Sequence, residues 1–148
     1  MTQEEFIEML KKKGYPCKME GDKIIVTHKG SVNLNSLETL PPGVEFRNDG
    51  YVYLGSLETL PPGVEFRNDG YVYLYSLETL PPGVEFRNDG YVNLSALKTI
   101  PPGAEFRNGG DVYLDGILGG WLKEWEGNIE GVDDKRLLNL MIKQVLFL

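Results

Sequence analysis

The side chains in this chain that could do chemistry are mainly carboxylates, and they recur at a fixed interval. Two Asp or Glu residues on either side of a glycosidic bond can hydrolyse it. Here every possible pair is duplicated with the same spacing, so no unique catalytic cleft is expected, and we predict that the protein is not an enzyme. One such series is formed by Glu45, Glu65, Glu85 and Glu105.

Other catalytic and metal-binding patterns are missing from the sequence. The chain has one histidine, His28, and one cysteine, Cys17, which are too few ligands for a zinc site. No glycine-rich phosphate loop or dinucleotide-binding motif occurs. We therefore expect no catalytic residue, no bound metal and no cofactor. The lone cysteine excludes an intramolecular disulfide and favours a reducing compartment.

The interval between these carboxylates is a sequence repeat of 20 residues. Residues 36–54, SLETLPPGVEFRNDGYVYL, recur unchanged at 56–74 and nearly unchanged from residue 76, and a more divergent copy covers 96–114. A fixed period of this size is typical of solenoids, in which each unit buries its apolar face against its neighbours.

Each repeat contains two short segments of alternating polarity. In the first, Val52 and Leu54 are expected inside and the two neighbouring tyrosines outside, and in the second Val64 and Phe66 are expected inside. Proline and glycine at the corners stop both segments. The sequence therefore predicts a mainly β fold, a right-handed parallel β-solenoid of about four to five coils with two strands per coil. Glu and Arg of the second segment should point outward, whereas the four asparagines should point inward and bond along a ladder of amides: Asn48, Asn68, Asn88 and Asn108.

Segments of different character stand at the two ends of the repeats. Residues 1–29 are expected to form a helix, with Thr2 and Glu5 as a capping box, followed by a hairpin. Residues 30–115 form the solenoid, and residues 116–148 a tryptophan-containing segment and a helical cap. We expect one structural domain in which the two end segments cover the open edges. The N-terminus shows neither a signal peptide nor an anchor, so a soluble, cytoplasmic protein without membrane contact is expected.

The repeat also resembles a known family. The run from Val52 through Leu54, Leu57 and Leu60 to Pro61-Pro62-Gly63-Val64 is similar to the leucine-rich repeat, especially its short 20-residue bacterial form. It differs in having Leu57 where Asn or Cys is usual, and in its second strand segment, which predicts weak curvature. The whole arrangement also resembles small solenoid proteins encoded by bacteriophages and prophages.

The net charge of −7 lies almost entirely in the repeats, because each of the three most similar copies carries three acids and one arginine. Coils that rise by about 4.8 Å would carry about seventy per cent of the charge density of B-DNA. Direct binding to nucleic acid is therefore not expected, and a partner with a basic surface is favoured.

Stacking turns the outward residues into columns, which we take as the candidate partner-binding residues. The phage resemblance and the charge density suggest a non-catalytic inhibitor of a host nucleic-acid-handling defence complex, of the anti-CRISPR or anti-restriction kind, in the cytoplasm of a bacterial host. The alternatives are a carbohydrate- or surface-binding module that uses the tyrosines, and a purely structural scaffold in which the tyrosines only stabilise stacking. The candidate residues are Tyr51, Tyr53, Tyr71, Tyr73, Tyr75, Tyr91 and Tyr113, with the acids Glu38, Glu58, Glu78, Asp49, Asp69 and Asp89.

The apolar C-terminus suggests a second interface. The last predicted helix carries more large apolar residues than one buried face needs, which suggests either a deep contact with the solenoid or a homodimer. The candidate dimer residues are Leu140, Met141, Leu146, Phe147 and Leu148.

Overall fold

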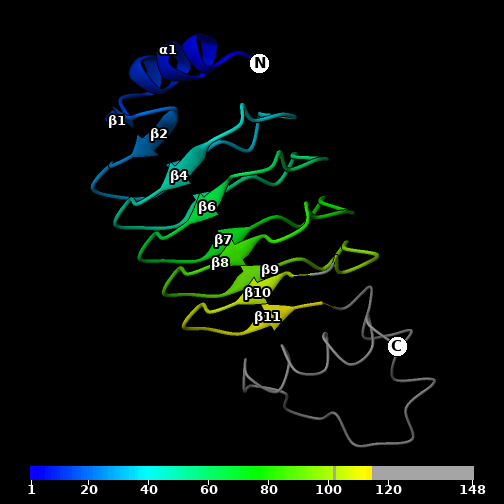
Figure 1. Ribbon diagram of the computed structural model, residues 1–148. Helices are drawn as coiled ribbons and strands as arrows, with labels where there is room; N and C mark the ends of the chain where they lie inside the picture. Colours follow the sequence, from blue (N-terminus) through cyan, green and yellow to red (C-terminus); the bar gives the residue numbers. More distant parts are fainter. Residues whose placement is uncertain (102, 115–148) are drawn as a thin grey trace, which may run out of the picture.

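The fold is that of a computed structural model, which describes residues 1–101 and 103–114. It is a mainly β parallel solenoid of about four turns, preceded by one α-helix, as the repeat predicts. Figure 1 shows the coils stacked one beneath another, with the helix at the N-terminal end. The predicted C-terminal cap and the candidate dimer residues lie outside the described residues.

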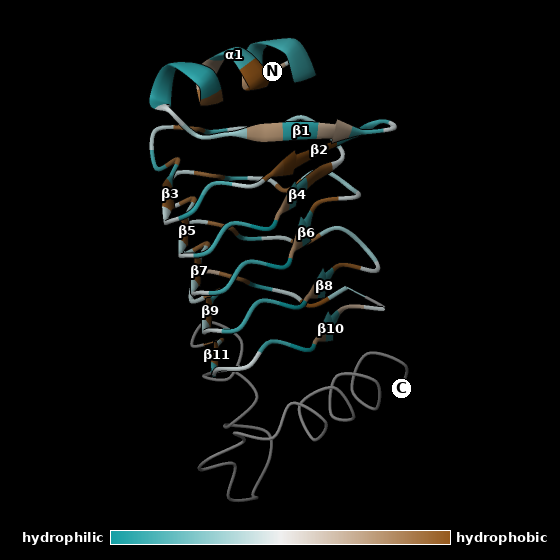
Figure 2. Ribbon diagram, turned by 90° about the vertical axis from the view of Figure 1, so that its left-hand side faces the viewer, coloured by the Kyte–Doolittle hydropathy of each residue, from teal (hydrophilic) through white to brown (hydrophobic). Residues whose placement is uncertain are grey.

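Two sheets form the sides of the solenoid, and each coil gives one short strand to each (Figure 2). Sheet A has the order β1-β2-β4-β6-β8-β10, and sheet B the order β11-β9-β7-β5-β3. The strands of sheet A are β1 (Cys17–Glu20), β2 (Lys23–Val26), β4 (Val44–Phe46), β6 (Glu65–Phe66), β8 (Glu85–Phe86) and β10 (Glu105–Phe106). Those of sheet B are β3 (Val32–Asn33), β5 (Val52–Tyr53), β7 (Val72–Tyr73), β9 (Val92–Asn93) and β11 (Val112–Tyr113).

The register between coils is the sequence repeat itself. Val52 pairs with Val72 and Phe46 with Phe66, in each case 20 residues apart and parallel. Backbone hydrogen bonds join the coils, for example from the Val52 amide to the Tyr71 carbonyl at 2.9 Å. Because residues 20 apart lie opposite each other, every repeated side chain becomes part of a column along the axis.

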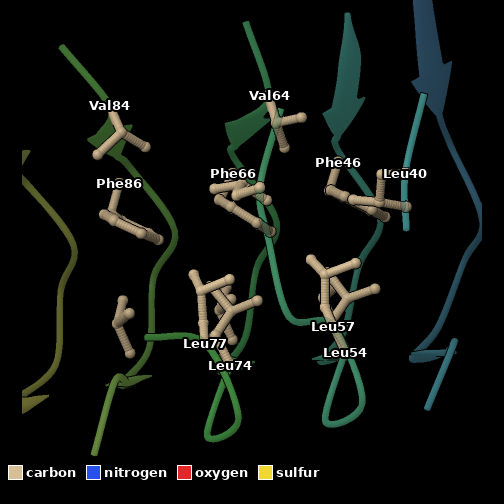
Figure 3. Close-up of a cluster of buried hydrophobic side chains, with 14 of the residues drawn as sticks. Leu40, Phe46, Leu54, Leu57, Val64, Phe66, Leu74, Leu77, Val84 and Phe86 are labelled. Atoms are coloured by element: carbon tan, nitrogen blue, oxygen red, sulfur yellow. The ribbon is translucent and has the colours of Figure 1, made fainter. Parts of the chain in front are cut away.

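The core consists of such columns of valine, leucine and phenylalanine (Figure 3). The rings of Phe46, Phe66, Phe86 and Phe106 stack at centroid distances of 5.4, 5.3 and 5.4 Å, and all four are fully buried. Leu57 and Leu60 also point inward, as predicted. Each fully buried side chain of this size contributes about 1.5–3 kcal/mol relative to an exposed one.

The four asparagines are buried as expected, but the predicted ladder of amides is wrong. The Nδ2 of Asn68 donates to the carbonyls of Gly50, Gly70 and Tyr71 at 3.0, 3.1 and 3.3 Å. Asn48, Asn88 and Asn108 make the same three types of bond, one to the preceding coil and two within their own. The inward carbonyls of the turn need donors, and the amide supplies them. The bonds therefore run from side chain to backbone.

The N-terminal segment closes one end of the solenoid. Helix α1 (Gln3–Lys13) is capped at its N-terminus by Thr2, whose Oγ1 accepts a hydrogen bond from the Glu5 amide at 3.1 Å, and at its C-terminus by Gly14. Phe6 and Leu10 are buried in the core. Strands β1 and β2 form the predicted antiparallel hairpin, and β2 also pairs in parallel with β4. The hairpin thus supplies the first two strands of sheet A.

At the N-terminal end of the solenoid, β3 is the edge strand of sheet B. The hydroxyl of Tyr15 accepts a hydrogen bond from the Asn33 amide at 3.1 Å. This amide lies on the outer edge of β3, where an unpaired donor could bind another strand. The side chain of Tyr15 therefore covers part of that edge.

The outer face of sheet A carries the repeated Glu and Arg side chains, which largely pair with each other. Arg87 lies 3.0 Å from Glu85, and Arg107 lies 2.7 Å from Glu105. Glu45 was predicted to be exposed, which is wrong, since its exposed fraction is 1%. It lies beside Ile25 of β2 and forms ion pairs with Arg47 and Arg67.

In the described part of the chain, no helix is long and apolar enough to cross a membrane.

Candidate binding surface

The candidate tyrosines lie together on the outer face of sheet B. The parallel register places Tyr51, Tyr71 and Tyr91 in one line, which we call the first tyrosine column. The second tyrosine column contains Tyr53, Tyr73 and Tyr113, with Asn93 between the last two. The period-2 alternation positions both columns, because Val52 and Leu54 of the same strand segment point into the core.

Within each column the rings stack on one another. The centroids of Tyr51 and Tyr71, and of Tyr71 and Tyr91, are 4.5 Å apart, with planes within 9° and 10° of parallel. Those of Tyr53 and Tyr73 are 4.9 Å apart and parallel to within 1°. Rings of different columns meet edge-on, as for Tyr71 and Tyr73 at 6.2 Å and 72°. Such contacts contribute about 0.5–1.5 kcal/mol each beyond the area that they bury.

Glycines two residues before the strands β7, β9 and β11 make room for these rings. The Cδ1 atom of Tyr51 lies where a Cβ on Gly70 would stand, and Tyr71 has the same relation to Gly90. A Cβ on Gly70 would also meet the backbone of Gly50 at 2.8 Å. In the sequence, turn geometry alone accounts for these glycines. The signal that could have identified their second role is their constant place directly before each outward tyrosine.

The stacking determines which part of each tyrosine is available to a ligand. Tyr71 has a parallel ring on each side along the column, Tyr51 and Tyr91, so both of its faces are covered. Ring edges and hydroxyl groups are therefore what the middle of the first column presents outward. A sugar stacks on the open face of an aromatic ring, and this surface has few open faces.

A column of aspartates borders the tyrosines on one side. Asp49, Asp69 and Asp89 are exposed at the turns that precede the strands of sheet B. Partial desolvation and the neighbouring carboxylates of Asp49 and Asp89 raise the pKa of Asp69. The two flanking carboxylates thus oppose the ionisation of Asp69, and a cation placed beside them would relieve this repulsion.

A column of glutamates borders the tyrosines on the other side, in the arm that follows each strand of sheet B. Glu38, Glu58 and Glu78 line an open hollow of about 670 Å³ together with serine and threonine side chains. Lys98 continues this column in the next coil and lies 3.2 Å from Glu78. The hollow is therefore acidic along most of its length and neutralised at one end. Its other lining residues are Ser56, Ser76, Thr59 and Thr79.

Charge pairing distinguishes the two sides of the solenoid. On sheet A each Glu of the repeat has an Arg partner. Across residues 1–101 and 103–114, no ion pair involves the three aspartates of the bordering column, and Glu78 alone among the three glutamates has one. The unpaired negative charge thus lies at both borders of the tyrosine face.

The residues with possible catalytic chemistry are placed apart from this face, near the N-terminal cap. Cys17 is partly buried, and burial raises the pKa of its thiol despite the nearby Lys11. The ring of His28 contacts Tyr15 at a centroid distance of 4.9 Å. Among the described residues, no group of three or more His, Cys, Asp or Glu side chains is arranged to hold a metal ion.

Tyr75 differs from the other tyrosines, because it follows the strand of its coil. Its ring covers the buried Gly55 of the preceding coil, and 44% of Tyr75 is exposed. Gly55 and Tyr75 are also the single difference between residues 36–55 and 56–75.

Comparison with known proteins identifies no relative of the chain, since no family model, curated protein or solved structure matches it.

Proposed function

We propose that the protein is a non-catalytic binding protein whose tyrosine face, with its acidic borders, docks onto a basic surface of a partner protein. The observation that carries this proposal is the uneven pairing of charge. Sheet A neutralises its own charges, whereas the acids beside sheet B have almost no partner among the described residues. Tyrosine adds a large contact area at low conformational cost.

The charge density supports a more specific partner class. Each of the three most similar repeats carries two net negative charges, compared with about 2.8 for B-DNA over a coil rise of about 4.8 Å. We propose a phage-encoded inhibitor that occupies the nucleic-acid site of a host defence complex in the bacterial cytoplasm. Competition by duplex DNA for the same partner site would be the direct sign of this mode.

Carbohydrate binding receives less support from the tyrosine geometry. The stacked rings cover each other's faces, which are the surfaces that a sugar ring would need. Binding to a sugar would also depend little on salt, whereas association through the acidic borders weakens as salt increases.

The test is capture of partner proteins from a bacterial lysate with two matched variants. The first replaces Tyr53 and Tyr73 by Asn, the residue that already stands at positions 33 and 93 of the same column. The second replaces Glu85 and Arg87 of sheet A by Gln, which removes one internal ion pair. We expect a partner that binds the wild-type protein and the sheet A variant but is lost with the tyrosine variant.

The purified partner is then used for binding measurements. Its affinity for the protein should fall steeply between low and high salt, and duplex DNA should compete with the protein for the partner. A partner that binds both variants equally, or that binds independently of salt, would contradict docking through this face. Binding that persists with excess DNA would contradict the nucleic-acid mimicry alone.

A further inference from the structure

The second tyrosine column has one interruption. The register pairs Tyr73 with Asn93 and Asn93 with Tyr113, so an asparagine stands where the stack would have a ring. The first tyrosine column is continuous over the same coils, with Tyr91 stacked on Tyr71. One position on the outer face of sheet B therefore differs from its equivalents.

The side chain of Asn93 is bonded within its own coil, to Ser95. Its Oδ1 accepts hydrogen bonds from the amide and the hydroxyl of Ser95, at 3.1 and 2.8 Å. Tyr73 stacks on Tyr53 on one side. On the side toward Asn93, no ring contact of Tyr73 occurs within the described residues, and 40% of Tyr113 is exposed.

The spacing along the column suits one planar group. In the first column, Tyr71 fills the distance between Tyr51 and Tyr91 with two centroid separations of 4.5 Å. Tyr73 and Tyr113 are likewise two coils apart, or about 9.6 Å at the usual strand spacing. Tyr113 meets Tyr91 of the preceding coil edge-on, at 5.7 Å and 82°, and the equivalent pair Tyr73 and Tyr51 also meets edge-on, at 6.3 Å and 64°. A planar group between Tyr73 and Tyr113 would contact a ring on each side.

The charges nearby decide which planar group fits. Asp111 lies two residues before Tyr113. It stands 20 residues after Tyr91 and therefore takes the next position in the first tyrosine column. Among the described residues Asp111 has no ion pair, and the outward positions of sheet B hold no Lys or Arg. A guanidinium is planar, stacks on aromatic faces and donates hydrogen bonds to carboxylates, whereas an ammonium group is a compact charge with no plane to lie between two rings.

We propose that the interruption at Asn93 is a binding site for one arginine side chain of a partner, held between Tyr73 and Tyr113 and paired with Asp111. This inference rests on the proposed function, because it names the chemistry that the tyrosine face recognises. It adds a defined position to that face. The surrounding columns repeat every coil, but this site occurs once in the described solenoid.

The test is an NMR titration of the full chain with N-acetyl-arginine amide, followed through the ring protons of Tyr73 and Tyr113. The matched probes are N-acetyl-lysine amide and N-acetyl-tyrosine amide. The key variant is Asn93→Tyr, which fills the position with the residue found in three equivalent coils and so should keep the fold. Asp111→Asn tests the ion pair.

We expect the arginine probe to shift both tyrosine signals and to bind at least tenfold more weakly to Asn93→Tyr. Asp111→Asn should weaken arginine binding and remove its salt dependence. Equal binding of the arginine probe to wild type and Asn93→Tyr, or equal binding of arginine and lysine, would overturn the inference. Stronger binding of the tyrosine probe than of the arginine probe would also overturn it, because the site would then prefer a neutral ring to a guanidinium. If a captured partner binds Asn93→Tyr as well as wild type, the proposed function survives and this site does not.

Discussion

The ring of Tyr75 occupies the space where a side chain on Gly55, one coil earlier, would begin. A side chain on Gly70 would meet Tyr51 and also the backbone of Gly50. The two glycines therefore differ in what an added methyl group would displace. A half-exposed tyrosine can swing outward, whereas a backbone held in a sheet cannot move without breaking hydrogen bonds.

Alanine substitutions should separate these two cases. We expect Gly70→Ala to lower the free energy of unfolding by about 1–3 kcal/mol, the usual cost of overpacking, and Gly55→Ala to cost clearly less. In Gly55→Ala the ring of Tyr75 should become more accessible to a fluorescence quencher. Urea denaturation of both variants gives the comparison, and equal losses would contradict it.

The buried asparagines should be essential to stability. Asn68→Ala removes the donor shared by the carbonyls of Gly50, Gly70 and Tyr71. We expect a loss of about 3 kcal/mol, the upper end of the range for a buried polar group left unpaired. Asn33→Ala is the control, because that asparagine is exposed. Chemical denaturation that shows the same small effect for both would refute this role.

The aspartate column should make stability depend on pH. Because the pKa of Asp69 is raised in the folded state, protonation favours folding. The contribution of Asp69 to stability is therefore full below the unfolded pKa of about 3.9 and is lost as the pH rises through the higher folded value. Asp69→Asn should be more stable than wild type at pH 7 and should show a smaller change with pH. Thermal unfolding from pH 3 to 7, with Glu8→Gln as control, measures this difference.

Removal of a complete coil should preserve the fold. Deletion of residues 36–55 or of residues 56–75 keeps the 20-residue register, and the two products differ only in having Tyr75 or Gly55 next to Asn35. Both should fold with one coil fewer and with lower stability, since each coil is stabilised by its neighbours. The product that keeps Tyr75 should be the less stable, because its ring then meets Asn35 in place of a glycine. Circular dichroism and urea denaturation of the two deletions decide the order.

Much of this fold could be predicted from the 20-residue repeat. Alternation within the repeat gave the inward Val, Leu and Phe, and the corners followed from Pro-Pro-Gly, whose glycine has φ between 75° and 82° in all four copies. The inclusion of β2 in sheet A was missed, although Ile24 and Val26 stand 20 residues before Val44 and Phe46. Their different residue types hid a spacing that the sequence contains.

Other features depend on contacts between coils that a repeat does not specify. Alternation placed Glu45 outside, but it is buried between Arg47 and Arg67 beside the cap strand β2. The bonding partners of Asn68 depend on which backbone carbonyls point inward, and the alternation of side chains does not predict the orientation of those carbonyls. The tyrosine columns were expected, but the covering of ring faces by neighbours follows from side-chain rotamers alone.

The interruption at Asn93 has a consequence for how any partner finds its place. On a perfectly periodic rod, a bound molecule shifted by one coil would meet the same side chains, so several positions would have equal energy. Such translational degeneracy allows sliding and favours no single complex. A single asparagine in a row of tyrosines removes the equivalence, so a partner that binds at the proposed site would have one position of lowest energy.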